Sequence, residues 1–164
     1  MLQEDIGAGY FRDGFLYLFG PYAAALNGVL SHWSFLFPDQ KDRKVIGYNA
    51  YGSLLVIEES AEQGTAAPIG VLDTLHVRYF TDPNLVFMNL IGHWLPQDKL
   101  PMFLDETVYQ AWRQTSDNHL AAGEILAITE PISLGGAFQL NNFQVEPIEE
   151  YFATTGPIYR KALS

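Results

Sequence analysis

Three short apolar runs lie close together in the first half of the sequence, and they constrain the fold more than any other feature. They cover residues 45–51, 54–57 and 69–72, with Gly52-Ser53 and Gly64 in the segments between them. Short runs of apolar and β-branched residues bounded by turn-forming residues are typical of β-strands. The sequence therefore predicts a meander of consecutive strands in this region.

Helical patterns lie on both sides of this meander. Apolar side chains recur at helical spacing in residues 22–33, directly after a proline, and in residues 82–94, which begin with an Asp-Pro pair. Pro147 opens a C-terminal helix that Gly156-Pro157 should break or bend. Another predicted helix begins at residue 105, and its inward residues are Val108, Ala111 and Trp112. We therefore expect an α+β fold, a single domain over residues 1–164 with a mainly antiparallel sheet and helices packed on it.

The remaining segments predict a hairpin, one more strand and a loop. Asp13-Gly14 separates two apolar and aromatic stretches, which is a hairpin signal. Residues 125–128 form a short apolar strand, and residues 131–142 form a loop rich in glycine and asparagine. Within that loop we expect Gly135 or Gly136 to adopt a positive φ, because a glycine pair that ends an apolar segment often reverses the chain.

The 164-residue chain has no cysteine, which excludes disulfides, thiolate nucleophiles and zinc held by sulfur. No apolar run approaches the roughly 18 residues that are needed to span a bilayer. The acidic residues Glu4 and Asp5 stand where a signal peptide would carry positive charge. We therefore expect a cytoplasmic protein with no membrane partner.

The acidic charge is the most informative bulk property. Nineteen acidic residues stand against nine basic ones, which gives a net charge of -10 at pH 7. A surface of this sign repels the phosphates of nucleic acids and attracts basic proteins, although acidity also serves solubility alone. Residues 45–77 contain no base, and residues 100–159 contain Arg113 as their one base. The candidate partner-binding acids in these stretches are Glu58, Glu59, Glu62, Asp105, Glu106, Glu146, Glu149 and Glu150.

One pair of residues has the chemistry of a catalytic dyad. Asp73 and His76 are three positions apart and would form a carboxylate–imidazole pair, with Ser53 or Ser133 as the nucleophile. Neither serine lies in the Gly-x-Ser-x-Gly turn that exposes a nucleophile. We favour a turn-forming role for Asp73 and a packed position for His76, so the sequence predicts no catalytic residue.

No metal or cofactor site is expected. His32, His93 and His119 are isolated and lack the spacing that places two ligands on one helical face. Gly7-Ala8-Gly9 starts like a dinucleotide-binding loop, but no strand precedes it, and residues 1–9 are predicted to be flexible. Gly135-Gly136 lacks the Lys-Ser or Lys-Thr pair of a phosphate-binding loop.

The order of several short motifs resembles one protein family. Phe11-Arg12-Asp13-Gly14-Phe15 is followed by Gly20-Pro21, by Tyr-Asn-Ala-Tyr-Gly-Ser-Leu-Leu over residues 48–55, and by Ser133-Leu134-Gly135-Gly136. This order is similar to that in the C-terminal domain of type VI secretion DNase-immunity proteins, a domain related to GAD-like domains. The likeness runs from about Phe11 to the C-terminus. The positions that carry the family motif are Gly14, Gly52, Glu124, Leu134, Gly135 and Gly136.

The chain also departs from that family pattern. Leu126 and Ile128 stand where the family has aromatic residues, Pro131 stands one place later, and Ser53 replaces an aspartate. The resemblance implies a non-catalytic immunity protein that neutralises a cognate nuclease toxin by direct binding, and the acidic charge fits a basic partner of that kind. The alternatives are a small ligand-binding module, a hydrolase-like enzyme with an unrecognised site, and a domain whose partner is unrelated to toxins.

Overall fold

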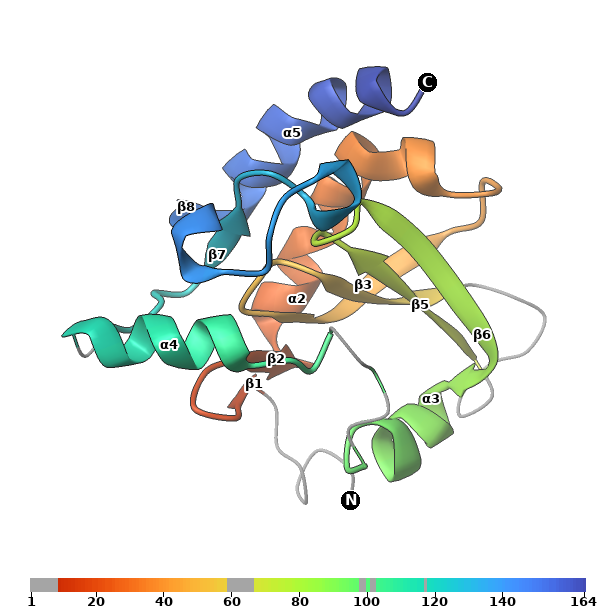
Figure 1. The fold of residues 1–164 in the computed structure, drawn as a ribbon. Helices are drawn as coiled ribbons and strands as arrows, with labels where there is room; N and C mark the ends of the chain where they lie inside the picture. Colours follow the sequence, from red (N-terminus) through yellow and green to blue (C-terminus); the bar gives the residue numbers. More distant parts are fainter. Residues whose placement is uncertain (1–8, 59–66, 98–99, 101–102, 117) are drawn as a thin grey trace.

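Two antiparallel sheets form the framework of the computed structural model, which describes residues 9–58, 67–97, 100, 103–116 and 118–164 (Figure 1). The smaller sheet pairs β7 (Glu124–Ile128) with β8 (Phe143–Pro147). In the larger sheet each strand pairs with its sequence neighbour, which confirms the predicted hairpin and meander. Its strands are β1 (Gly9–Phe11), β2 (Leu16–Leu18), β3 (Arg43–Asn49), β4 (Leu54–Glu58), β5 (Pro68–Asp73) and β6 (Arg78–Val86).

Helices cover both faces of the larger sheet, so the predicted α+β class is confirmed (Figure 1). One face carries α2 (Pro21–Ala25), the 3-10 helix η1 (Leu26–Leu36) and α5 (Ile148–Ala162). The other face carries α3 (Phe87–Asn89), the π-helix η3 (Leu90–Trp94) and α4 (Thr107–Ser116). The loop between β7 and β8 contains two single turns, η4 (Ile132–Leu134) and η5 (Leu140–Asn142).

Because both faces are covered, the strands carry apolar side chains on both sides. In β4, Leu54 and Val56 pack towards α5, whereas Leu55 packs towards α4. In β7, Ile125 and Leu126 divide between the same two cores. Strands that are buried on both faces contain continuous apolar runs instead of alternating ones, which is the pattern that predicted them.

The predicted start of the helix over residues 82–94 is wrong. β6 continues through Asp82 and Pro83, and α3 begins only at Phe87. Asp82 Oδ1 accepts a hydrogen bond from the N–H of Asn84 at 2.8 Å, which is also the contact that a helix N-cap makes. Proline fits here because β6 lies at the end of the strand order, where its missing N–H interrupts no ladder.

The helix predicted for residues 22–33 begins as α2 but continues as the 3-10 helix η1. The hydroxyls of Ser31 and Ser34 donate hydrogen bonds to carbonyl oxygens three residues earlier, at 3.0 and 3.1 Å. Such side-chain bonds compete with the regular bonds of an α-helix. The apolar spacing still buries one side of η1, through Leu26, Val29, Leu30 and Trp33.

The predicted break at Gly156-Pro157 is also wrong, because α5 runs across both residues. A Cβ atom on Gly156 would lie 2.4 Å from the carbonyl oxygen of His32, so the glycine lets α5 approach η1 closely. Phe152 and Tyr159 then pack against the fully buried ring of Trp33. This aromatic burial offsets the helix hydrogen bond that proline cannot donate.

Two smaller predictions also change. In α4, Val108 is buried and Trp112 half-buried as expected, but Ala111 is exposed and Tyr109 faces the core instead. The strand β8 was not predicted, because its sequence is short, ends in a proline and is largely exposed.

Candidate functional site

Four tyrosines gather where β1, β2 and β3 meet α2, and we call them the tyrosine cluster: Tyr10, Tyr17, Tyr22 and Tyr48. The strand register places Tyr10 opposite Tyr17 and Tyr17 opposite Tyr48. The ring centroid of Tyr17 lies 4.8 Å from that of Tyr10, 5.1 Å from that of Tyr48 and 5.6 Å from that of Tyr22. Tyr17 and Tyr48 are buried, whereas Tyr10 and Tyr22 are each 46% exposed. The cluster therefore presents two aromatic rings to solvent on a buried base.

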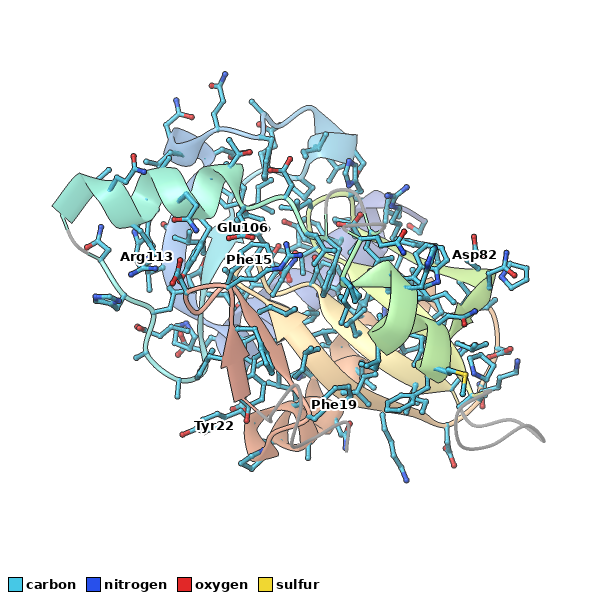
Figure 2. The ribbon with its side chains drawn as sticks, turned by 90° about the horizontal axis from the view of Figure 1, so that it is seen from below. Phe15, Phe19, Tyr22, Asp82, Glu106 and Arg113 are labelled. Carbon is cyan, nitrogen blue, oxygen red and sulfur yellow. The ribbon has the colours of Figure 1, made fainter. Side chains whose placement is uncertain are left out.

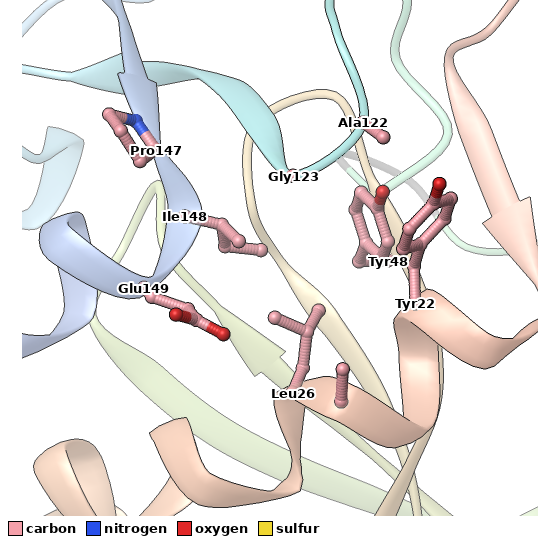
Figure 3. A pocket seen from close by; sticks show the side chains of 9 residues that line it. Tyr22, Leu26, Tyr48, Ala122, Gly123, Pro147, Ile148 and Glu149 are labelled. Carbon is pink, nitrogen blue, oxygen red and sulfur yellow. The ribbon is translucent and has the colours of Figure 1, made fainter.

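A pocket of about 250 Å³ opens beside this cluster, and we call it the tyrosine pocket (Figure 3). Figure 3 shows Tyr22 and Tyr48 on one side, Glu149 on the other, and Leu26 and Ile148 between them. The N–H of Ile148 donates to the carbonyl oxygen of Gly123 at 2.8 Å, which ties the start of α5 to the turn before β7. The lining residues are Tyr22, Ala25, Leu26, Tyr48, Ala122, Gly123, Pro147, Ile148 and Glu149.

The pocket is mostly apolar and carries negative charge. Among the described residues that line it, Glu149 is the one charged side chain, and none is a lysine or arginine. The hydroxyls of Tyr22 and Tyr48 add polar groups, and burial raises the pKa of Tyr48, so that hydroxyl stays protonated and neutral. The volume is below the roughly 300–1,000 Å³ of pockets that enclose small molecules. The pocket is therefore suited to one side chain of a partner.

Of the three predicted acids Glu58, Glu59 and Glu62, the structure describes Glu58, and its side chain is not available to a partner. This residue is 7% exposed, and its carboxylate accepts hydrogen bonds from Arg43 Nε at 2.9 Å and from the Tyr79 hydroxyl at 2.7 Å. A buried, paired carboxylate is part of the core, so the assignment of Glu58 to a partner-binding patch is wrong. Glu59 and Glu62 lie outside the described residues.

Asp105 and Glu106, two more of the predicted acids, serve the start of α4. Asp105 Oδ1 accepts hydrogen bonds from the N–H and the hydroxyl of Thr107, at 3.0 and 2.6 Å. Glu106 pairs with Arg12 of the β1–β2 hairpin at 3.2 Å. Arg113, within α4, also reaches this hairpin, where its Nη1 donates to the carbonyl oxygen of Asp13 at 3.1 Å (Figure 2). These acids therefore hold α4 in place.

The last three predicted acids, Glu146, Glu149 and Glu150, lie at or just before the start of α5. Glu146 is half-buried and accepts a hydrogen bond from Gln144 at 3.0 Å. Glu149 and Glu150 are exposed in the first turn of α5, where acids offset the helix dipole. Of these, the structure brings Glu149 to the tyrosine pocket.

The positions of the family motif shape turns. Gly135 has a φ of 106°, which confirms the predicted positive φ, and Gly14 and Gly52 have φ values of 89° and 82°. Glu124 accepts a hydrogen bond from the N–H of Ala121 at 2.8 Å, and Leu134 is exposed on the loop after β7. These contacts describe a structural role for the motif and do not form a binding site.

Asp73 and His76 do pair, but their geometry is that of a turn. His76 Nδ1 lies 2.9 Å from Asp73 Oδ2, and Arg78 Nε donates to the same oxygen at 3.0 Å. Asp73 Oδ1 accepts the N–H groups of Leu75 and His76. Ser133 donates its hydroxyl to the carbonyl oxygen of His76 at 2.5 Å, which commits that hydrogen to the backbone. Asp73 therefore organises the turn between β5 and β6.

We expect Asp73→Asn to lower the free energy of unfolding by about 1–3 kcal/mol, because an amide would turn its N–H groups towards Arg78 and His76. His76→Ala should cost less, since it removes one half-buried partner and leaves the backbone bonds of Asp73 intact. Urea denaturation measures both changes. Esterase, phosphatase or nuclease turnover in the parent protein that both variants abolish would contradict the turn interpretation.

The remaining candidate features are the second serine, metal ligands and membrane-spanning helices. Ser53, the other candidate nucleophile, is buried, and its Oγ lies 3.0 Å from the hydroxyl oxygen of Thr74. Within the described ranges, no three histidine or acidic side chains gather as metal ligands would. The helices found there are too short or too polar to cross a membrane.

Sequence reasoning missed the tyrosine pocket. Its walls come from residues about 100 positions apart, and only the folded chain brings them together. One signal was available in the sequence, since Tyr22 follows Pro21 in the first turn of a helix, where side chains are often exposed. Nothing in the sequence connects that tyrosine to Glu149.

Comparisons with known proteins support the fold. No family model matches the chain, and no curated protein matches it. The crystal structure of Atu4351 from Agrobacterium tumefaciens is similar, with a TM-score of 0.57 and 14% sequence identity over 94% of this chain and 72% of that chain. At this identity the likeness shows the fold alone, so the α+β arrangement recurs in a chain of largely different sequence.

Proposed function

We propose that this chain is a non-catalytic protein-binding domain that neutralises a basic protein toxin, in the manner of an immunity protein, through the face that carries the tyrosine pocket. The observation that carries the proposal is the pocket itself. It combines a half-exposed tyrosine, an apolar floor and a carboxylate on the surface of a chain with a net charge of -10.

This combination matches the physics of protein recognition. Tyrosine is enriched among the residues that contribute most to binding energy, because a large ring contacts a partner with little loss of conformational entropy. The buried Tyr17, which stacks on Tyr48, holds Tyr22 in position: its ring lies 5.6 Å from that of Tyr22, and its hydroxyl accepts the N–H of Tyr22 at 3.1 Å. The acidic field around the site would speed the encounter with a basic partner.

Other features favour binding over catalysis. The hydroxyl of Ser133 is committed to a backbone carbonyl, and the Asp73 carboxylate is occupied by Arg78, His76 and two backbone N–H groups. The pocket volume is small for a metabolite. An acidic face that mimics nucleic-acid phosphates is the expected complement of a nuclease surface, and a cytoplasmic location is part of this proposal.

The proposal is tested by measuring association with the product of the neighbouring gene. We expect the on-rate to fall by at least about tenfold between low and high salt, because the Debye length shrinks from about 10 Å at 0.1 M to about 3 Å at 1 M. We also expect Glu149→Lys to slow association strongly. Stopped-flow or surface-based kinetics gives both rates.

The matched control is Glu130→Lys, which makes the same change of charge at an exposed acid outside the pocket. It should lower the on-rate much less than Glu149→Lys. Equal losses of on-rate in Glu149→Lys and Glu130→Lys would show that Glu149 acts only through the net charge of the protein. A salt-independent on-rate that neither variant changes would contradict a basic partner.

A further inference from the structure

Resting on the proposed function, we propose that the tyrosine pocket receives one arginine side chain of the partner. The guanidinium group would lie between the Tyr22 ring and the Glu149 carboxylate, and its methylene stem would contact Leu26 and Ile148. Figure 3 shows Tyr22 and Tyr48 on one side of the opening and Glu149 on the other, with Leu26 and Ile148 between them.

The charges select a cation. Glu149 and Glu150 stand in the first turn of α5, whose dipole places roughly half a positive charge at that end. The full charge of Glu149 at the pocket outweighs this partial charge and leaves the rim negative. Since no basic residue lines the described pocket, an incoming cation would meet no competing positive side chain.

The aromatic wall selects arginine over lysine. A guanidinium is planar and weakly hydrated, so it stacks on a tyrosine face and pairs with a carboxylate through two parallel N–H groups. An ammonium is compact and strongly hydrated, and it would lose more of its water in a mostly apolar pocket. The hydroxyl of Tyr48 provides a further acceptor for the five N–H donors of an arginine.

The test uses single amino-acid derivatives, because a polycation would bind any acidic protein. The probes are the N-acetyl methylamides of L-arginine, L-lysine and L-norleucine, titrated into the ¹⁵N-labelled protein. We expect saturable shifts of the Gly123 and Glu149 amide signals with the arginine probe. Affinity should be weaker for lysine and weakest for norleucine.

Four variants identify the contacts. Tyr22→Leu and Glu149→Gln should each weaken the arginine probe by about tenfold, which corresponds to about 1.4 kcal/mol. Tyr22→Phe keeps the aromatic face and should bind within about twofold of the parent. Glu150→Gln removes the same charge one residue along α5, outside the pocket lining, and should also have little effect.

Several results would overturn the inference. Equal binding of all three probes would show that the pocket accepts any aliphatic chain. Equal losses in Glu149→Gln and Glu150→Gln would show long-range attraction instead of contact. If the partner binds in a manner that depends on Glu149 while the arginine probe does not, the inference fails and the proposed function stands; if the probe binds and no basic protein does, the proposed function fails.

Discussion

Glu58→Gln is expected to lower the free energy of unfolding by about 1.5–3 kcal/mol, because the Arg43 guanidinium loses one of its two carboxylate partners and keeps Asp39, whose Oδ1 lies 2.7 Å from Nη2. The Arg43 side chain is 2% exposed, and its Nη2 lies 2.9 Å from Glu58 Oε2. Its guanidinium also stacks over the ring of Phe37, 4.4 Å from the centroid. Chemical denaturation measures the loss.

A nearby exposed pair provides the control. Lys41 and Asp39 lie 3.7 Å apart with side chains 49% and 42% exposed, so Lys41→Met should change stability by less than about 1 kcal/mol. The double variant Arg43→Met/Glu58→Leu should be more stable than Glu58→Gln, since it removes both charges. A loss below about 1 kcal/mol in Glu58→Gln would mean that Glu58 is not held as described here.

Gly136→Ala is expected to destabilise the protein by about 3 kcal/mol or more, because the added Cβ atom would collide with the backbone. That atom would meet the carbonyl oxygen of Glu130 far inside contact distance, at 1.7 Å. The same oxygen accepts a hydrogen bond from Asn142 Nδ2 at 2.8 Å, so moving it would also break the contact that closes the loop.

Gly135→Ala is the matched comparison, since it places the same substitution at the adjacent residue. Gly135 has a φ of 106° but open space around it, where the nearest atom lies 3.7 Å away. Its cost should therefore be about 1–2 kcal/mol, from backbone conformation alone. Thermal or urea unfolding of both variants gives the order, and a larger loss for Gly135→Ala would contradict the contact with Glu130.

The buried strands were predictable because burial on both faces leaves a strong local signal, as in residues 54–57 and 125–128. The start of the helix after β6 was not, because Asp82 makes the same side-chain contact in an extended strand that an N-cap makes in a helix. Gly156-Pro157 carries a real breaking signal that the packing of α5 on Trp33 overrides. Local chemistry could not reveal which interaction would win in these two places.

The sequence alone could not show which predicted acid reaches a binding surface. Glu149 and Glu58 were both candidates, and each is a glutamate with a second glutamate beside it. One is exposed beside the tyrosine pocket and the other is buried against Arg43. The difference depends on which strand or helix places each residue, and that is settled only by the tertiary structure.

The strand order has a consequence for how the pocket forms. Strands that pair with their sequence neighbours close short loops, so the six-stranded sheet should assemble early in folding. The contact between Trp33 Nε1 and Thr155 Oγ1 spans 122 positions and should form later. Because α5 supplies Ile148 and Glu149, the pocket exists only after α5 has docked. Occupancy of the pocket should therefore slow the hydrogen exchange of the α5 amides, since a ligand that needs the docked helix opposes its local unfolding.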